Sequence, residues 1–277
     1  MNITKAVALV LTMLLSTAHT ACADDSQPQA NHVGLFGQQP GEPGFVRLFN
    51  GTDLDGWSGQ PDCWTVRDGA IESTGKGKAR NWLIHQGLAP ADFELRLQFR
   101  FQKGNSGVQV RSKDIGDWQV RGYQVEIANH DVMGLWHHSL MSPDEPIQKT
   151  RKHLATAGQR VLIRKDATKT VDLFGSPEHI QSNCHDGEWN ELVVIARGPR
   201  LIQKINGVVF SDLTDHQTGF ASRAGVIAFQ DHGKGTIAAF RNIRIRSFDA
   251  ESTTSQDKAT QFGADRTSSV TTEEPAK

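Results

Sequence analysis

The chain has 277 residues and a formal net charge of −1, with 30 Lys and Arg residues against 31 Asp and Glu residues. The chain therefore has no net positive charge, so its composition gives no reason to expect binding to nucleic acid or attraction to an anionic membrane. Hydrophobic residues make up 37% of the chain and glycine occupies 26 positions, which is typical of one large turn-rich β domain or two small domains.

The first 23 residues are predicted to be a signal peptide for export. Lys5 precedes an apolar run over residues 6–15 that is too short to span a bilayer as a permanent helix. Two processing patterns fit the Ala-Cys-Ala sequence that follows. Ordinary cleavage would leave Asp24 as the new N-terminus, whereas lipidation of Cys22 would tether the mature protein to a membrane. Both patterns predict an exported protein, either periplasmic or membrane-anchored.

Two polar segments flank the predicted folded domain. Residues 24–44 contain Gln, Pro and Gly without an apolar period, which indicates a linker. Residues 249–277 are rich in Ser, Thr, Asp and Glu and lack the apolar content needed to fold, which predicts a disordered tail. The folded domain is therefore expected to be residues 45–248, which contain no internal repeat.

A period of two dominates the folded part. Residues 92–101 alternate apolar and polar side chains throughout, which predicts a half-buried strand. No Gly-rich phosphate loop and no alternation of strands with helices is present. The pattern therefore favours an antiparallel all-β fold rather than a parallel sheet covered by helices.

Residues 131–157 have no clean period and are too long for a plain connection, so we expect a functional loop with a short helix near residues 149–157. Histidines gather in this stretch with one aspartate. The group comprises His130, Asp131, His137, His138 and His153. Such a set can bind a divalent cation, but its spacing matches no metal signature. We therefore predict a solvated loop here and no cofactor.

The last third of the domain continues the β pattern. Residues 189–196 form a predicted apolar strand, and residues 200–212 form a predicted hairpin. The hairpin turns at Asn206 and Gly207, because both residue types tolerate positive φ. The remaining predicted strands are residues 224–230 and 237–248. Many short strands joined by turns of this kind predict an antiparallel β-sandwich.

Two cysteines, Cys63 and Cys184, fall within the predicted domain. Their spacing is not that of a metal site. In an oxidising periplasm they can pair, and the alternative that we favour is two separate buried thiols.

Eight short segments follow one another in a recognisable order. They are FVRLFNGTDLDGW at 45–57, WTVRDGAI at 64–71, DFELRL at 92–97, NSGV at 105–108, GYQVEI at 122–127, GEWN at 187–190, NG at 206–207 and FRNIRI at 240–245. Together they resemble the 3-keto-disaccharide hydrolase family over nearly all of the predicted domain. The resemblance implies a concanavalin-A-like jelly roll, and it implies a substrate class of glycosides whose 3-hydroxyl has been oxidised to a ketone.

Strand alternation predicts which polar side chains share the outward face of this sandwich. In residues 122–127 apolar side chains alternate with Gln124 and Glu126, which must therefore face away from the core. The same reasoning applies to the predicted strands around Val108 and Phe229. The polar side chains assigned in this way to one face are Gln109, Arg111, Gln124, Glu126, Gln230 and His232.

This set suits the chemistry of a 3-keto sugar. The ketone acidifies the hydrogen on C2, a base removes it, and the substituent on C1 leaves by elimination, after which water can add to give net hydrolysis. The route needs one base and a cationic or hydrogen-bonding partner for the enolate oxygen, not the paired carboxylates of ordinary glycosidases. Glu126 is the candidate base, and Arg111 and His232 are the candidate partners. An Arg111 guanidinium beside Glu126 would keep its pKa low.

The sugar itself is expected to contact amide and aromatic side chains. The predicted substrate-binding residues are Asn105, Gln109, Gln124, Gln230 and Trp136. Trp82 and Trp118 also lie near predicted loops and are further candidates for stacking on a sugar ring. The alternative interpretation is that Glu126 and Arg111 form an ion pair on a solvated face, with Asn105 serving a turn.

Three functions remain open on these grounds: an enzyme acting on 3-keto glycosides, a non-catalytic carbohydrate-binding module, and a surface-attachment domain. A buried Glu126 beside a cation would favour the enzyme. An open groove floored by aromatic residues would favour the binding module, and a flat charged face would favour the attachment domain. The sugar is the expected partner in the first two cases.

We predict that the mature protein lacks the residues before Cys22 or Asp24, because small residues at this point suit signal-peptide cleavage. Mass spectrometry of the protein purified from its host identifies the new N-terminus. A Cys22 that carries lipid identifies the anchored form. Recovery of the intact N-terminus from the cytoplasm would contradict export.

Overall fold

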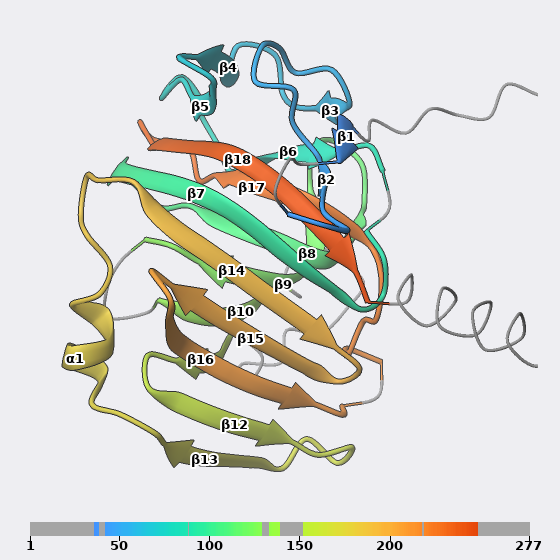
Figure 1. Cartoon of the computed structure of the whole chain (residues 1–277), viewed down its shortest axis with the longest axis vertical. Helices are drawn as coiled ribbons and strands as arrows, with labels where there is room; N and C mark the ends of the chain where they lie inside the picture. The colour runs from blue at the N-terminus through green and yellow to red at the C-terminus, as the bar shows by residue number, and fades with distance from the viewer. Residues whose placement is uncertain are drawn as a thin grey trace, which may run out of the picture. The chain divides into compact units, whose positions relative to one another are not determined.

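The computed structural model describes residues 36–38, 42–87, 89–128, 133–138, 152–217 and 219–248. The predicted signal peptide, the Cys22 lipidation site and the predicted C-terminal tail lie outside these residues. Two β-sheets face each other across a hydrophobic core (Figure 1). The predicted all-β antiparallel sandwich is confirmed.

One sheet has eleven strands. Nine follow the order β1-β2-β18-β7-β14-β15-β16-β12-β13. The other two are β5, which pairs with β18 on the same edge as β2, and β4, which pairs with β5. Within the described residues all of its pairings are antiparallel except that of β12 with β16. Its strands are β1 (Phe36–Gln38), β2 (Val46–Arg47), β4 (Trp64–Arg67), β5 (Ala70–Ser73), β7 (Phe93–Lys103), β12 (Gln159–Ile163), β13 (Lys169–Leu173), β14 (Asn190–Arg197), β15 (Arg200–Ile205), β16 (Val208–Asp215) and β18 (Ile237–Ser247). Strand β1 lies in the segment predicted to be a linker.

The other sheet has seven strands in the order β11-β10-β9-β8-β17-β6-β3. They are β3 (Trp57–Ser58), β6 (Asn81–His85), β8 (Gly107–Asp114), β9 (Val120–Glu126), β10 (Gly134–His138), β11 (His153–Thr156) and β17 (Val226–Asp231). The helix expected near residues 149–157 is wrong, because β11 occupies part of this segment and pairs with β10. The described residues contain one short helix, α1 (Pro177–Gln181), and no helix that is long and apolar enough to cross a membrane.

The strands with the clearest sequence signals form where they were predicted. Strand β7 buries its alternate apolar side chains, and β15 and β16 form the predicted hairpin. At its turn Asn206 and Gly207 have φ of 47° and 83°, the left-handed conformation that a two-residue hairpin turn of this type requires. Local turn chemistry thus sets the register of this hairpin.

Aromatic rings join the two sheets at the centre of the core. Phe229 of β17 and Phe240 of β18 stack with their ring centroids 4.0 Å apart and their planes at 5°. Trp57 stacks on Phe229 with a centroid distance of 5.0 Å. Elsewhere in the core, Cys63 and Cys184 are buried free thiols and do not form a disulfide, as in the alternative that we favoured.

We predict that Phe240→Ala lowers the free energy of unfolding by about 3–5 kcal/mol, because it leaves a cavity where a buried ring contacts the other sheet. The matched control is Val171→Ala on β13, where the side chain is 43% exposed, and its expected loss is about 0.5 kcal/mol or less. Urea denaturation curves measure both values. Equal losses in the two variants would contradict the assignment of Phe240 to the core.

Candidate functional site

Four polar side chains form a buried cluster on the outer face of the seven-stranded sheet, the face turned away from the core. They are Gln109 from β8, Gln124 and Glu126 from β9, and Gln230 from β17, and we call them the glutamine–glutamate cluster. Alternation predicted this shared face. None of the four is more than 3% exposed, so the face is not solvated, and each polar group in it needs a partner.

A chain of hydrogen bonds runs through the cluster and ends on the carboxylate. Nε2 of Gln109 donates to Oε1 of Gln124 at 2.8 Å. Nε2 of Gln124 in turn donates to Oε2 of Glu126 at 2.8 Å and to Oε1 of Gln230 at 3.0 Å. The hydroxyl of Ser112 donates to Oε1 of Gln109 at 2.7 Å. The order of donors and acceptors therefore directs one amide N–H toward the carboxylate.

The Glu126 carboxylate is the unusual group in this cluster. Burial raises its pKa from the ordinary value of 4.5 to about 8, although hydrogen bonds from the Gln124 side chain and the Ala128 backbone act in the opposite direction. Its second oxygen, Oε1, is buried without a hydrogen-bond partner among the described residues. A buried carboxyl group with one unpartnered oxygen and a pKa near neutrality is suited to accepting or delivering a proton.

Arg111 does not share this site, and its predicted position is wrong. A bulge between Val110 and Lys113 shifts the register of β8, and Arg111 adopts a positive φ of 48°. Its buried guanidinium donates to the carbonyl oxygens of Ala91 at 3.0 Å and Gly198 at 2.8 Å, and lies 3.1 Å from Oδ1 of Asp92. Arg111 therefore fastens β8 to the end of the other sheet. The expectation that it lowers the pKa of Glu126 fails for the same reason.

The β8–β9 hairpin also reaches across the outer face. The backbone N–H of Trp82 on β6 donates to the carbonyl oxygen of Trp118 in the hairpin turn at 3.0 Å. Val120 packs there against Trp82, Ile84 and Ala228, which form a second, smaller hydrophobic cluster. This contact makes Trp82 fully buried, so its ring is a wall of the site rather than an exposed platform.

Aromatic side chains adjoin the cluster from β10. Trp136 stands opposite Gln124 in the β9–β10 register, on the predicted face. Its ring lies 6.0 Å from that of His138, which is 5.5 Å from the ring of Trp82. The indole N–H groups of both tryptophans are buried without a hydrogen-bond partner in the described parts of the chain, so each can donate to a bound hydroxyl.

Positive charge gathers beside Trp82. The Arg80 guanidinium lies 5.5 Å from the centre of the Trp82 ring. Burial, followed by the charges of Arg80, His137 and His232, lowers the pKa of His138 to about 3. Burial also lowers the pKa of His232, with Arg80 contributing in the same direction. The neutral form of both imidazoles is therefore favoured at pH 7, whereas Arg80 is a permanent cation beside them. Sequence reasoning missed Arg80, although it is two residues from Trp82, a predicted sugar-stacking candidate near a loop.

Asn105 lies in the loop between β7 and β8, next to Ser106, whose hydroxyl donates to the backbone carbonyl of Gln230 at 2.7 Å. Its side-chain Oδ1 is buried and has no hydrogen-bond partner among the residues described. Asn105 is therefore near the end of the cluster, with an amide oxygen available to accept a hydrogen bond.

The histidines of the predicted loop do not lie together in one group. His137 contacts the ring of Tyr123 on the core side of the sheet, with ring centroids 5.2 Å apart, whereas His138 faces the site. His130 and Asp131 lie outside the described residues. In the part of the chain that the structure describes, no three His, Cys, Asp or Glu side chains are grouped as metal ligands.

Comparison with known proteins gives one family. The sequence model described as the 3-keto-alpha-glucoside-1,2-lyase-like domain matches residues 44–246. No curated protein matches the chain.

Several solved structures are similar at low sequence identity. Two are candidate glycosyl hydrolases from Parabacteroides distasonis, with 20% and 19% identity and TM-scores of 0.47 and 0.48; each covers 74% of this chain, and the alignments cover 99% and 94% of those chains. A third is the carbohydrate-binding module CBM66 from Bacillus subtilis, with 14% identity, a TM-score of 0.44 and coverage of 69% of this chain and 96% of that one.

The raised pKa of Glu126 predicts a pH-dependent stability. Because the folded-state pKa of about 8 exceeds the ordinary 4.5, ionisation costs more in the folded state, so the contribution of Glu126 to the free energy of unfolding should fall as pH rises from 4.5 to 8. Glu126→Gln should remove this fall, which amounts to at most about 1.4 kcal/mol per pH unit. Urea denaturation of both proteins across this range measures the difference, and parallel pH profiles would contradict the buried, raised-pKa carboxyl.

Proposed function

Because the chain belongs to the 3-keto-alpha-glucoside-1,2-lyase-like family, we propose that it cleaves glycosides whose C3 hydroxyl has been oxidised to a ketone. The glutamine–glutamate cluster is the proposed active site. The observation that carries the proposal is the buried Glu126 carboxyl, which has one oxygen fixed by Gln124 and the other without a partner among the described residues.

In the proposed reaction the ionised Glu126 removes the proton from C2 through its Oε1. The electrons of the C–H bond move into the C2–C3 bond, and the ketone oxygen becomes an enolate. When the enolate returns its electrons, a C1–C2 double bond forms, the C1–O bond breaks, and the departing alkoxide takes the proton that Glu126 removed from C2. Addition of water across the new double bond gives net hydrolysis. A pKa of about 8 makes Glu126 a stronger base than an ordinary carboxylate.

The enolate oxygen needs a cation or hydrogen-bond donors. We assign this task to Arg80 and to the neutral His232 in place of Arg111, because both lie with Trp82 and His138 on the cationic side of the site. A guanidinium in a half-buried position stabilises a developing negative charge more strongly than it would in water. A neutral imidazole N–H can also donate a hydrogen bond to the enolate oxygen or to the departing oxygen.

Orientation of the sugar is assigned to the groups around the carboxylate. Gln230 and Asn105 hold hydroxyl groups at one end, and the indole of Trp136 offers an apolar ring and an N–H donor at the other. Gln109 contributes indirectly, because its amide fixes that of Gln124, which fixes Glu126. Each of these roles is assigned from the residue's position in or beside the glutamine–glutamate cluster.

We predict that Glu126→Gln lowers the release of the C1 substituent from a 3-keto glucoside by at least about 100-fold, because the amide cannot accept the C2 proton while it keeps the shape of the side chain. Release of nitrophenol from a nitrophenyl 3-keto-glucoside gives the rate directly. The matched control is Glu178→Gln on the exposed surface of α1, which should retain the wild-type rate.

The same assay with the unoxidised nitrophenyl glucoside separates the alternatives. Elimination requires the ketone, so the wild-type protein should release little nitrophenol from this substrate. Comparable rates on both substrates would replace the elimination route with ordinary hydrolysis. Binding of the 3-keto glucoside without any release would make the protein a carbohydrate-binding module.

A further inference from the structure

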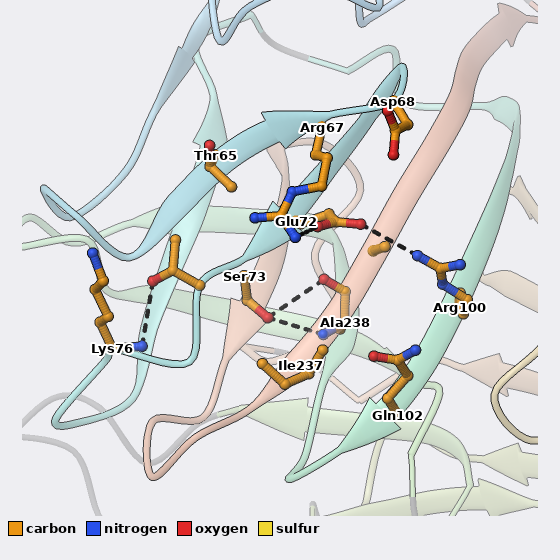
Figure 2. Close-up of a pocket in the computed structure, with 12 residues that line it drawn as sticks. Thr65, Arg67, Asp68, Glu72, Ser73, Lys76, Arg100, Gln102, Ile237 and Ala238 are labelled. Atoms are coloured by element: carbon orange, nitrogen blue, oxygen red, sulfur yellow. Dashed lines mark hydrogen bonds and ion pairs between the residues drawn. The ribbon is translucent and has the colours of Figure 1, made fainter.

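A second hollow lies on the opposite side of the sandwich, on the outer face of the eleven-stranded sheet. It is a cavity of about 620 Å³ between the β4–β5 hairpin and strands β18 and β7 (Figure 2). Its volume falls within the range of small-molecule sites, about 300–1,000 Å³. The cavity shares no lining residue with the glutamine–glutamate cluster.

The register of four strands explains the hollow. Thr65 of β4 pairs with Glu72 of β5, Glu72 pairs with Ala239 of β18, and Ala239 pairs with Arg100 of β7. These four side chains therefore form one row across the face. The methyl group of Ala239 is the smallest of them and stands between two long side chains, so the row dips at β18 and leaves a floor with polar walls.

The walls carry charges of both signs, with three cationic and two anionic side chains. Oε1 of Glu72 lies 3.3 Å from Nη2 of Arg100, and its Oε2 lies 3.7 Å from Nη1 of Arg67 (Figure 2). The Glu72 side chain is only 17% exposed, so its position between two guanidinium groups is fixed. Lys76 and Asp68, one of each sign, complete the charged lining. The Glu72 carboxylate partly neutralises the two arginines, which weakens their attraction for an anion, and the arginines repel a cation.

We propose that this hollow binds one unit of a neutral sugar, as a carbohydrate-binding site separate from the proposed active site. A sugar ring presents neighbouring hydroxyl groups that donate and accept at once. Glu72 and Asp68 accept hydrogen bonds, Arg67, Arg100 and Lys76 donate them, and Thr65 and Gln102 do both. A lining with both kinds of group suits a neutral polyol, which donates and accepts, better than a carboxylate or phosphate, which only accepts.

An aromatic ring borders the same wall. Trp189 is partly exposed, and the guanidinium groups of Arg100 and Arg241 lie 4.9 and 4.0 Å from its ring centre. The stacking holds Arg100 from the side opposite to Glu72 and restricts its side chain in the absence of ligand. Its donors are therefore oriented before a sugar arrives, which lowers the entropy lost on binding.

Titration of ¹⁵N-labelled protein with methyl glucoside, and separately with the sodium salt of methyl glucuronide, tests the site by NMR. The neutral sugar is expected to shift the backbone amide signals of Glu72, Arg100 and Ala239. Ala239→Met, which fills the floor, should weaken this binding by at least about tenfold. The matched control Val209→Met, on an exposed position of β16, should leave the binding unchanged.

Glu72→Gln is the second test variant, for use if Ala239→Met does not fold, and it keeps the shape of the wall. It removes the counter-charge of both arginines, so affinity for the neutral glucoside should fall while affinity for the glucuronide rises. Absence of shifts at the hollow with the neutral sugar, tighter binding of the glucuronide by the wild type, or unchanged binding in both variants would overturn the proposal. Glu126→Gln should not affect this binding, so a failure here is distinct from a failure of the proposed catalytic activity.

Discussion

The burial of the Glu126 carboxyl is the constraint on which the seven-stranded sheet depends. A buried carboxylate needs a cation or a set of hydrogen-bond donors, and this sheet supplies amide donors in place of a cation. The arrangement requires space for those amides. Gly107 provides it, because a Cβ atom at this position would collide with the Gln124 side chain. The Gly107 backbone, the hydrogen-bonded glutamine amides and the Glu126 carboxyl thus depend on one another. The result is a pKa of Glu126 near 8, which keeps its proton bound up to near-neutral pH.

The two outer faces of the sandwich show how exposure decides the choice of polar groups. On the eleven-stranded sheet, Glu94 forms ion pairs with Arg96 at 2.6 Å and with Arg246 at 2.7 Å. Such pairs cost little at a partly exposed surface because solvent screens them. On the buried face of the other sheet, long neutral amides replace charged partners. The same period-two pattern therefore gives an ion-pair network on the outer face of the eleven-stranded sheet and a buried carboxyl with a raised pKa on that of the seven-stranded sheet.

Much of the fold follows from local signals in the sequence. Alternation alone places Gln109, Gln124, Glu126 and Gln230 together, because a strand cannot turn one polar residue inward without exposing its apolar neighbours. It cannot report how deeply that face is covered, since the turn of the β8–β9 hairpin packs against Trp82 and Ile84 of β6, a contact between segments that are distant in the sequence. The position of Arg80 depends on the same contact, and it carries no periodic signal of its own.

The bulge in β8 has a consequence for variation among related chains. Up to Val110, odd-numbered side chains of β8 point to the outer face and even-numbered ones to the core. Beyond the bulge the two sets have changed sides. Loss of one residue there would turn the Arg111 side chain onto the outer face that carries Glu126 without a single side-chain replacement. A length change in this strand is thus equivalent to adding a positive charge to this face, and an alignment that counts only substitutions would overlook it.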